Sequence, residues 1–258
     1  MFKKYKLKRK EELLRKIRIK NMPTSIRGEE TLQRNFEELN DEIANFYLIL
    51  SENLPFAVPN FLDRLSSLDI IITRSSYKEH TGKYDNKLND LVVYLPISGE
   101  YEISPDFRET LYHELLHMAS SYNHKEKDVS GFLNEIKTTF STIKIGSILN
   151  EGYTELLTKR YFKCTDNEYY KKEVILASRI EEFIGREEME KAYFEGNLDY
   201  IIERFNDAGI DGLSFIQEIS YARLLLDDKY FNEVLNKIPK SKKDNIKKKQ
   251  LNKLNDII

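Results

Sequence analysis

The first strong hydrophobic pattern in the chain has a helical period. Between Glu29 and about Ser51, apolar side chains recur in alternating steps of four and three; they are Leu32, Phe36, Leu39, Ile43, Phe46 and Leu50. This spacing places them on one face, so the pattern predicts an amphipathic helix over this stretch. Asn53, Pro55 and Pro59 end it, and a short helical turn is predicted around Phe61–Leu65.

The pattern then changes to short apolar runs typical of strands. Leu68–Thr73 and Leu91–Leu95 predict two buried strands, and a polar connector with turn-forming residues, 84–90, lies between them. A third extended segment is predicted within Ile136–Ile145, which is rich in Thr and Ile. We expect the first two segments and part of the third to form one small twisted sheet.

Helices dominate the rest of the chain. Ser104 is a good N-cap, Pro105 a good first helical residue, and the helix they open is predicted to reach about Ser121. Another helix is predicted from Leu149 to Tyr161. After Asp166 the pattern stays helical, with breaks at Gly185, Gly196, Gly209 and Gly212.

Composition narrows the class of protein. The 258 residues include only 10 Gly and 6 Pro, which disfavours a turn-rich all-β fold, so we predict an α+β fold. The predicted domains are a basic N-terminal segment (1–27), a domain over 28–165, a helical subdomain over 166–240 and a Lys-rich tail (241–258). The net charge of −2 gives no reason to expect a nucleic-acid partner.

Targeting signals are not evident in the sequence. No apolar run approaches the ~20 residues that span a bilayer, and no apolar segment follows the basic N-terminus as it would in a signal peptide. We therefore predict a cytoplasmic protein without a membrane span. The single cysteine, Cys164, excludes an internal disulfide and a zinc cluster built from cysteines, and we interpret it as a buried packing residue.

Candidate chemistry is concentrated in the helix that Ser104 opens. It contains the sequence His113-Glu114-Leu115-Leu116-His117. Side chains four residues apart lie on the same helix face, so both histidines can bind one Zn²⁺. Glu114 lies one step around the helix, where it can act as a general base on a water without binding the metal.

A third metal ligand is needed, and a second helix offers candidates. The metzincin pattern fails because Ser120 and Asn123 stand where it requires Gly and His, and His124 is interpreted as a surface residue. The segment Asn150-Glu151-Gly152-Tyr153-Thr154-Glu155, together with the two histidines, resembles the gluzincin metallopeptidases of the thermolysin and aminopeptidase type. It is also similar to short zincin-like proteins of low-GC bacteria.

The resemblance implies a zincin-like fold, Zn²⁺ as cofactor and a peptide or protein as substrate. It implies that Glu151 is the third ligand and that Glu155 holds the ring of His113 from outside the ligand set. Because Glu151 and Glu155 are four residues apart, they share a helix face, which suits these roles. If Glu151 is not a ligand, His124 and Asp128 are the next candidates.

Zincins commonly present an edge strand to which the substrate backbone adds. Leu91–Leu95 is the matching element, so Asn89, Leu91 and Val93 are predicted to bind substrate, with an ordinary core strand as an equal alternative. A tyrosine is the expected oxyanion donor, and Tyr153, Tyr193, Tyr221 and Tyr230 are candidates. A zinc protein that regulates without cleaving, and a nucleic-acid protein that uses the basic termini, remain alternatives.

Overall fold

The computed structural model describes residues 29–74, 82–95, 104–123, 127–137, 142–163, 170–224 and 228–240. The chain divides into two compact units, one of Met1–Ser130 and Leu157–Asn167 and one of Gly131–Leu156 and Glu168–Ile258. The predicted domain bounds stay a prediction. The basic segment 1–27 and the Lys-rich tail 241–258 lie outside the described residues.

The first unit begins with two of the predicted helices. Helix α2 spans Glu29–Asn53, and its apolar stripe is buried at Leu39, Ile43, Phe46 and Leu50. A single turn of 3-10 helix, η1 (Pro55–Ala57), and helix α3 (Val58–Leu65) follow. Phe46 stacks on Phe162 with a centroid distance of 4.7 Å. The predicted helical periodicity is therefore confirmed here.

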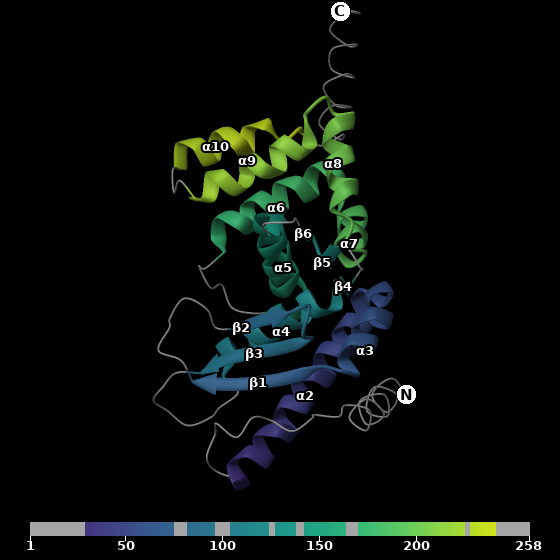
Figure 1. Ribbon diagram of the computed structural model, residues 1–258, viewed down its shortest axis with the longest axis vertical. Helices are drawn as coiled ribbons and strands as arrows, with labels where there is room; N and C mark the ends of the chain where they lie inside the picture. Colours follow the sequence, from purple (N-terminus) through teal and green to yellow (C-terminus); the bar gives the residue numbers. More distant parts are fainter. Residues whose placement is uncertain are drawn as a thin grey trace, which may run out of the picture. The chain divides into compact units, whose positions relative to one another are not determined.

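Three strands form a mixed sheet in the order β1-β3-β2 (Figure 1). β1 (Asp69–Arg74) and β3 (Asp90–Leu95) are the two predicted strands and pair in parallel, with Ile70 opposite Leu91. β2 (Gly82–Asp85) pairs antiparallel with β3. This strand was not predicted, and its second half falls in the predicted polar connector, because four residues with Gly, Lys and Asp give no hydrophobic alternation.

Helix α4 (Pro105–Ala119) packs against β2 and β3, and it also contacts α2 and α3 (Figure 1). Its predicted N-terminus is confirmed, because the Ser104 hydroxyl accepts a hydrogen bond from the amide of Phe107 at 3.1 Å. Every side chain from Glu109 to Ala119 is buried. The helix that carries the candidate ligands is thus an interior helix of the first unit.

A short hairpin extends the C-terminal end of α4. β4 (Ser121–Asn123) pairs antiparallel with β5 (Lys127–Ser130). Polar side chains fasten this hairpin: Asn60 Nδ2 donates to the carbonyl of Ser121 at 3.1 Å, and Asn86 Nδ2 donates to the carbonyl of Val129 at 2.9 Å. Because Asn86 lies in the turn between β2 and β3, the hairpin also anchors one end of β2.

The predicted third strand is two strands. β6 (Leu133–Lys137) and β7 (Thr142–Ile145) pair antiparallel, with Ile136 opposite Ile143. They belong to a different sheet from β1, β2 and β3, so the prediction of one sheet containing all three segments is wrong. Apolar and β-branched residues identify strands but carry no information about which strands pair.

Helices make up the remainder. Helix α5 (Ser147–Phe162) matches the second predicted site helix. α6 (Lys171–Ile184), α7 (Arg186–Phe194), α8 (Leu198–Asp207), α9 (Gly212–Leu224) and α10 (Asp228–Lys237) follow. The predicted breaks are confirmed, and Gly185, Gly196 and Gly209 all have positive φ.

The predicted α+β class is confirmed. Within the described part of the chain, no helix is both long and apolar enough to cross a membrane.

Three aspartates form one row across the sheet, and this generates a prediction. Asp90 lies opposite Asp69 in β1 and opposite Asp85 in β2. Burial, and then the charges of these two neighbours, raise the pKa of Asp90. Its ionised form is therefore disfavoured in the folded state. Like charges directly opposite each other are destabilising, so Asp90→Asn should stabilise the protein at neutral pH by roughly 0.2–1 kcal/mol, the size of a typical cross-strand side-chain interaction.

Urea unfolding at several pH values measures this gain. It should disappear as pH falls through the acidic range in which Asp90 takes up its proton. Asp85→Asn is the matched control and should lower stability at neutral pH. Although burial acts to raise the pKa of Asp85, hydrogen bonds from the Leu88 and Lys87 amides hold it below its usual value. A loss of stability in Asp90→Asn at neutral pH would contradict the prediction.

Candidate metal centre

The His-Glu-Leu-Leu-His segment lies in the middle of α4 with its polar side chains buried. The exposed fractions are 6% for His113, 8% for Glu114 and 7% for His117. Histidine is often partly buried, but an interior glutamate is rare unless it is paired or functional. Burial of all three groups on one helix therefore points to a specific polar site.

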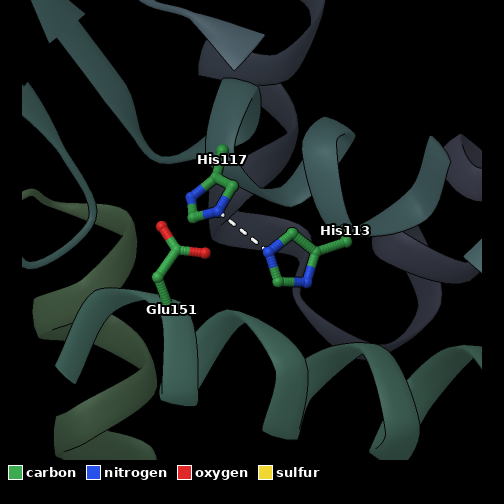
Figure 2. A group of neighbouring side chains, drawn as sticks. All are labelled: His113, His117 and Glu151. Atoms are coloured by element: carbon green, nitrogen blue, oxygen red, sulfur yellow. Dashed lines mark hydrogen bonds between the residues drawn. The ribbon is translucent and has the colours of Figure 1, made fainter. Parts of the chain in front are cut away.

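The two imidazoles meet at their Nε2 atoms. These atoms lie 3.1 Å apart, and the rings are inclined at 71° (Figure 2). Two nitrogens bound to one tetrahedral Zn²⁺ at 2.0–2.1 Å are separated by about 3.3 Å. The pair therefore needs to separate by only a few tenths of an ångström to hold one metal ion.

Glu151 completes a group of three possible ligands. One carboxylate oxygen of Glu151 and one nitrogen from each histidine all lie within 4.8 Å of one another. Figure 2 shows the carboxylate, carried by α5, pointing toward both rings. The three residues predicted as ligands are thus brought together, with two neutral nitrogen donors and one anionic oxygen, a donor set that suits Zn²⁺.

The backbone of His117 is held by three serine hydroxyls. Ser120, Ser121 and Ser130 donate to its carbonyl oxygen at 3.1, 2.6 and 3.3 Å. Ser121 and Ser130 also approach each other, with their Oγ atoms 2.9 Å apart. This buried cluster satisfies a carbonyl at the open end of α4 and fixes the last turn of the helix, which carries the second histidine.

The residues on either side of Glu151, which are Asn150 and Gly152, each have a structural role. The Asn150 side-chain oxygen accepts a hydrogen bond from the Phe132 amide at 3.0 Å, which joins the start of α5 to the turn before β6. A Cβ on Gly152 would lie 2.2 Å from the carbonyl oxygen of Glu173 in α6. Glycine is needed there because the α6 backbone approaches α5 so closely. Sequence reasoning missed this contact, for which no local signal exists.

Glu155 is buried with 2% of its surface exposed. It lies one turn after Glu151 on α5, among the buried side chains of Thr154 and Thr158. An interior position agrees with a role beside the site better than with a solvated acidic face. The contact with His113 that the resemblance implies stays a prediction.

The predicted substrate strand is corrected by the structure. β3 is the central strand and its backbone pairs on both sides, so it has no free edge to offer a peptide. Leu91 and Val93 are buried core residues, and the edges among the described strands of this sheet are β1 and β2. The sequence shows an apolar run but not its place in the strand order.

Asn89 has a structural role in the turn before β3. Its side-chain nitrogen donates to the Arg64 carbonyl at 2.8 Å, and its oxygen accepts from the Tyr84 hydroxyl at 2.7 Å. Burial raises the pKa of Tyr84 to about 12, against the opposing charge of Arg64. Tyr84 therefore stays protonated and keeps this hydrogen bond over the whole range in which the protein would be studied.

Three of the four tyrosines predicted as possible oxyanion donors form hydrogen bonds with residues other than the three candidate metal ligands. Tyr153 donates to Glu181 at 2.9 Å, Tyr193 shares a 2.6 Å hydrogen bond with Thr154, and Tyr230 donates to Glu218 at 3.1 Å. Tyr221 is exposed. The identity of an oxyanion donor stays a prediction.

Of the other candidate residues, Asp128 is buried, with a carboxylate oxygen 3.9 Å from the Lys87 amine. His124 and Cys164 lie outside the described residues.

Comparisons with known proteins identify no relatives. No protein-family model matches the chain, and neither a curated protein nor a solved structure matches it significantly.

The serine cluster behind His117 generates a prediction. Ser121→Ala removes a fully buried hydroxyl whose Oγ lies 2.6 Å from the His117 carbonyl oxygen and 2.9 Å from the Oγ of Ser130. We expect the free energy of unfolding to fall by about 1 kcal/mol, as is usual for a lost buried hydrogen bond. Urea unfolding measures it, with Ser66→Ala as the control because that hydroxyl bonds to a carbonyl at an exposed position. Equal stability of the two variants would contradict a stabilising role for the cluster.

Proposed function

We propose that this protein is a zinc-dependent metallopeptidase. The observation that carries the proposal is the convergence of His113, His117 and Glu151 around one point, with the buried Glu114 next to the first ligand. Two histidines and a carboxylate leave one position of a tetrahedral zinc open, which is the arrangement of catalytic rather than structural zinc sites. The resemblance of the two helix motifs to gluzincins supports the same interpretation.

In this proposal the chain supplies the ligands and a base. When bound, the metal would polarise the scissile carbonyl and make a water more acidic. Glu114 accepts a proton from the attacking water and delivers it to the leaving amine nitrogen. Its low exposure suits this task, because a carboxylate shielded from bulk water keeps its proton within the site. Glu155 would hold the ring of His113 in one orientation.

A second candidate is a zinc site that binds or senses the metal without hydrolysis. The burial of both histidines and of Glu114 favours it, because a structural site is closed to solvent. The part-exposed Glu151 favours access from outside. The two candidates make different predictions for Glu114, since a purely structural site has no use for a base.

Glu114→Gln should retain one zinc per chain and lose hydrolysis by about 10²–10⁴-fold, because the amide cannot accept a proton. Zinc is measured by elemental analysis, and cleavage by mass spectrometry on a mixed peptide library. Wild-type protein stripped with a chelator and then reloaded with zinc is the control for metal dependence. Loss of zinc together with activity would mean that Glu114 has been assigned wrongly, and unchanged activity would remove the proposed mechanism.

Glu151→Ala should lose zinc affinity because it removes one of three protein ligands. Titration with a competing chelator measures the dissociation constant directly and does not depend on knowing a substrate. Glu182→Ala, on the exposed face of α6, is the matched control and should bind zinc like the wild type. A Glu151→Ala protein that still holds one zinc tightly would place the third ligand elsewhere, with His124 and Asp128 as the next residues to test.

A further inference from the structure

The edge strand β2 passes directly over the proposed base. Gly82 is the first residue of β2 and lies opposite Val93 in the central strand. A Cβ built on Gly82 would point at α4, 2.5 Å from Cγ2 of Thr110 and 3.0 Å from Cγ of Glu114. It would also lie 3.3 Å from Oε1 of Glu114. The space that a side chain would fill here is therefore occupied by the side chains of Thr110 and Glu114.

Backbone conformation does not explain a glycine at this position. Gly131, Gly146, Gly185, Gly196 and Gly209 have positive φ, but Gly82 does not, so its backbone is one that any residue adopts. What the position lacks is room. Thr110 cannot give way easily, because it is buried and a β-branched side chain in a helix has few alternative rotamers.

We infer that Gly82 is a positioning residue for Glu114. This inference rests on the proposed function and names a residue that the sequence motif does not include. A methyl group at position 82 would press on the Cγ atom of the glutamate side chain, close to its root, and would so displace the whole carboxylate. A displacement of about 1 Å at a catalytic group can cost on the order of 10²-fold in rate. The three atoms nearest to this methyl group belong to Thr110 and Glu114, and none of them belongs to the ligands His113 and His117.

A methyl group at position 82 would both lower the stability of the protein and move Glu114, and these two effects must be separated. In Gly82→Ala alone, the added methyl group overlaps with both Thr110 and Glu114. This variant is therefore expected to lose stability and to move the base. Thr110→Ser removes the Cγ2 atom involved in the closest contact and keeps the hydroxyl. The double variant Gly82→Ala/Thr110→Ser is therefore expected to regain most of the stability while the pressure on Glu114 remains.

The experiment compares the wild type, both single variants, the double variant and Glu114→Gln. Lys83→Ala is the control from the same strand, since Lys83 is exposed and paired with Asp85. Thermal unfolding, zinc affinity, kcat and KM on a peptide selected from the library are measured for each. We expect the double variant to bind zinc like the wild type, with kcat about 10–100-fold lower and KM unchanged. Thr110→Ser and Lys83→Ala should keep wild-type kcat.

A readout without turnover completes the test. A peptide hydroxamate chelates zinc and gives its hydroxyl proton to a nearby carboxylate, whereas a peptide thiol binds zinc through sulfur alone. Calorimetry should show weaker hydroxamate binding in the double variant and in Glu114→Gln, with thiol binding unchanged in both. This comparison tests the position of Glu114 even in a protein for which no peptide is cleaved.

The possible failures are distinguishable. A folded double variant with wild-type kcat and wild-type hydroxamate affinity would overturn the role of Gly82 and leave the proposed function intact. A fall in zinc affinity equal to the fall in kcat would show that Gly82 supports the metal site as a whole, which also overturns it. Wild-type kcat in Glu114→Gln would overturn the proposed function and this inference with it.

Discussion

Helix α4 carries two histidines and a glutamate into the interior of the first unit. The burial of these three polar side chains is the constraint on which the surrounding structure depends. A buried polar group without a partner costs free energy comparable to that released by several buried methylene groups. The two Nε2 atoms of the histidines face each other at 3.1 Å, and the carboxylate of Glu151 faces both. A cation at their meeting point would be in reach of all three donors at once.

The supporting contacts are hydrogen bonds to backbone atoms. Three serine hydroxyls bind the His117 carbonyl, and the side chains of Asn60, Asn86 and Asn150 bind main-chain atoms of the β4 and β5 hairpin and of the turn before β6. Short polar side chains have few rotamers, so such bonds hold the backbone with little loss of conformational entropy. Rigid helix ends in turn hold the side chains that they carry.

At two glycines, the backbone of one element lies unusually close to atoms of a neighbouring element. At Gly82 the strand β2 runs against Thr110 and Glu114, and at Gly152 the helix α5 meets the carbonyl of Glu173. Neither glycine has a positive φ, so each is required for space rather than for conformation. These contacts fix two of the elements that carry candidate site residues, and they do so with the smallest residue available.

Local chemistry in the sequence was sufficient for the helices and for two strands. Ser104 and Pro105 mark the start of α4, and spacing by four residues places His113 and His117 on one face, because both features depend only on neighbours along the chain. Local chemistry in the sequence did not predict which strands pair. β2 has too few apolar residues to be predicted from the sequence. β3 proved to be the central strand, so Asn89, Leu91 and Val93 serve the core instead of an exposed edge.

A resemblance suggested Glu151 as a ligand, but its approach to two histidines more than thirty residues earlier depends on how distant elements pack. Only the tertiary structure brings the carboxylate within 4.8 Å of both rings and Gly82 over Glu114, because contacts between distant segments leave no periodic signal in the sequence.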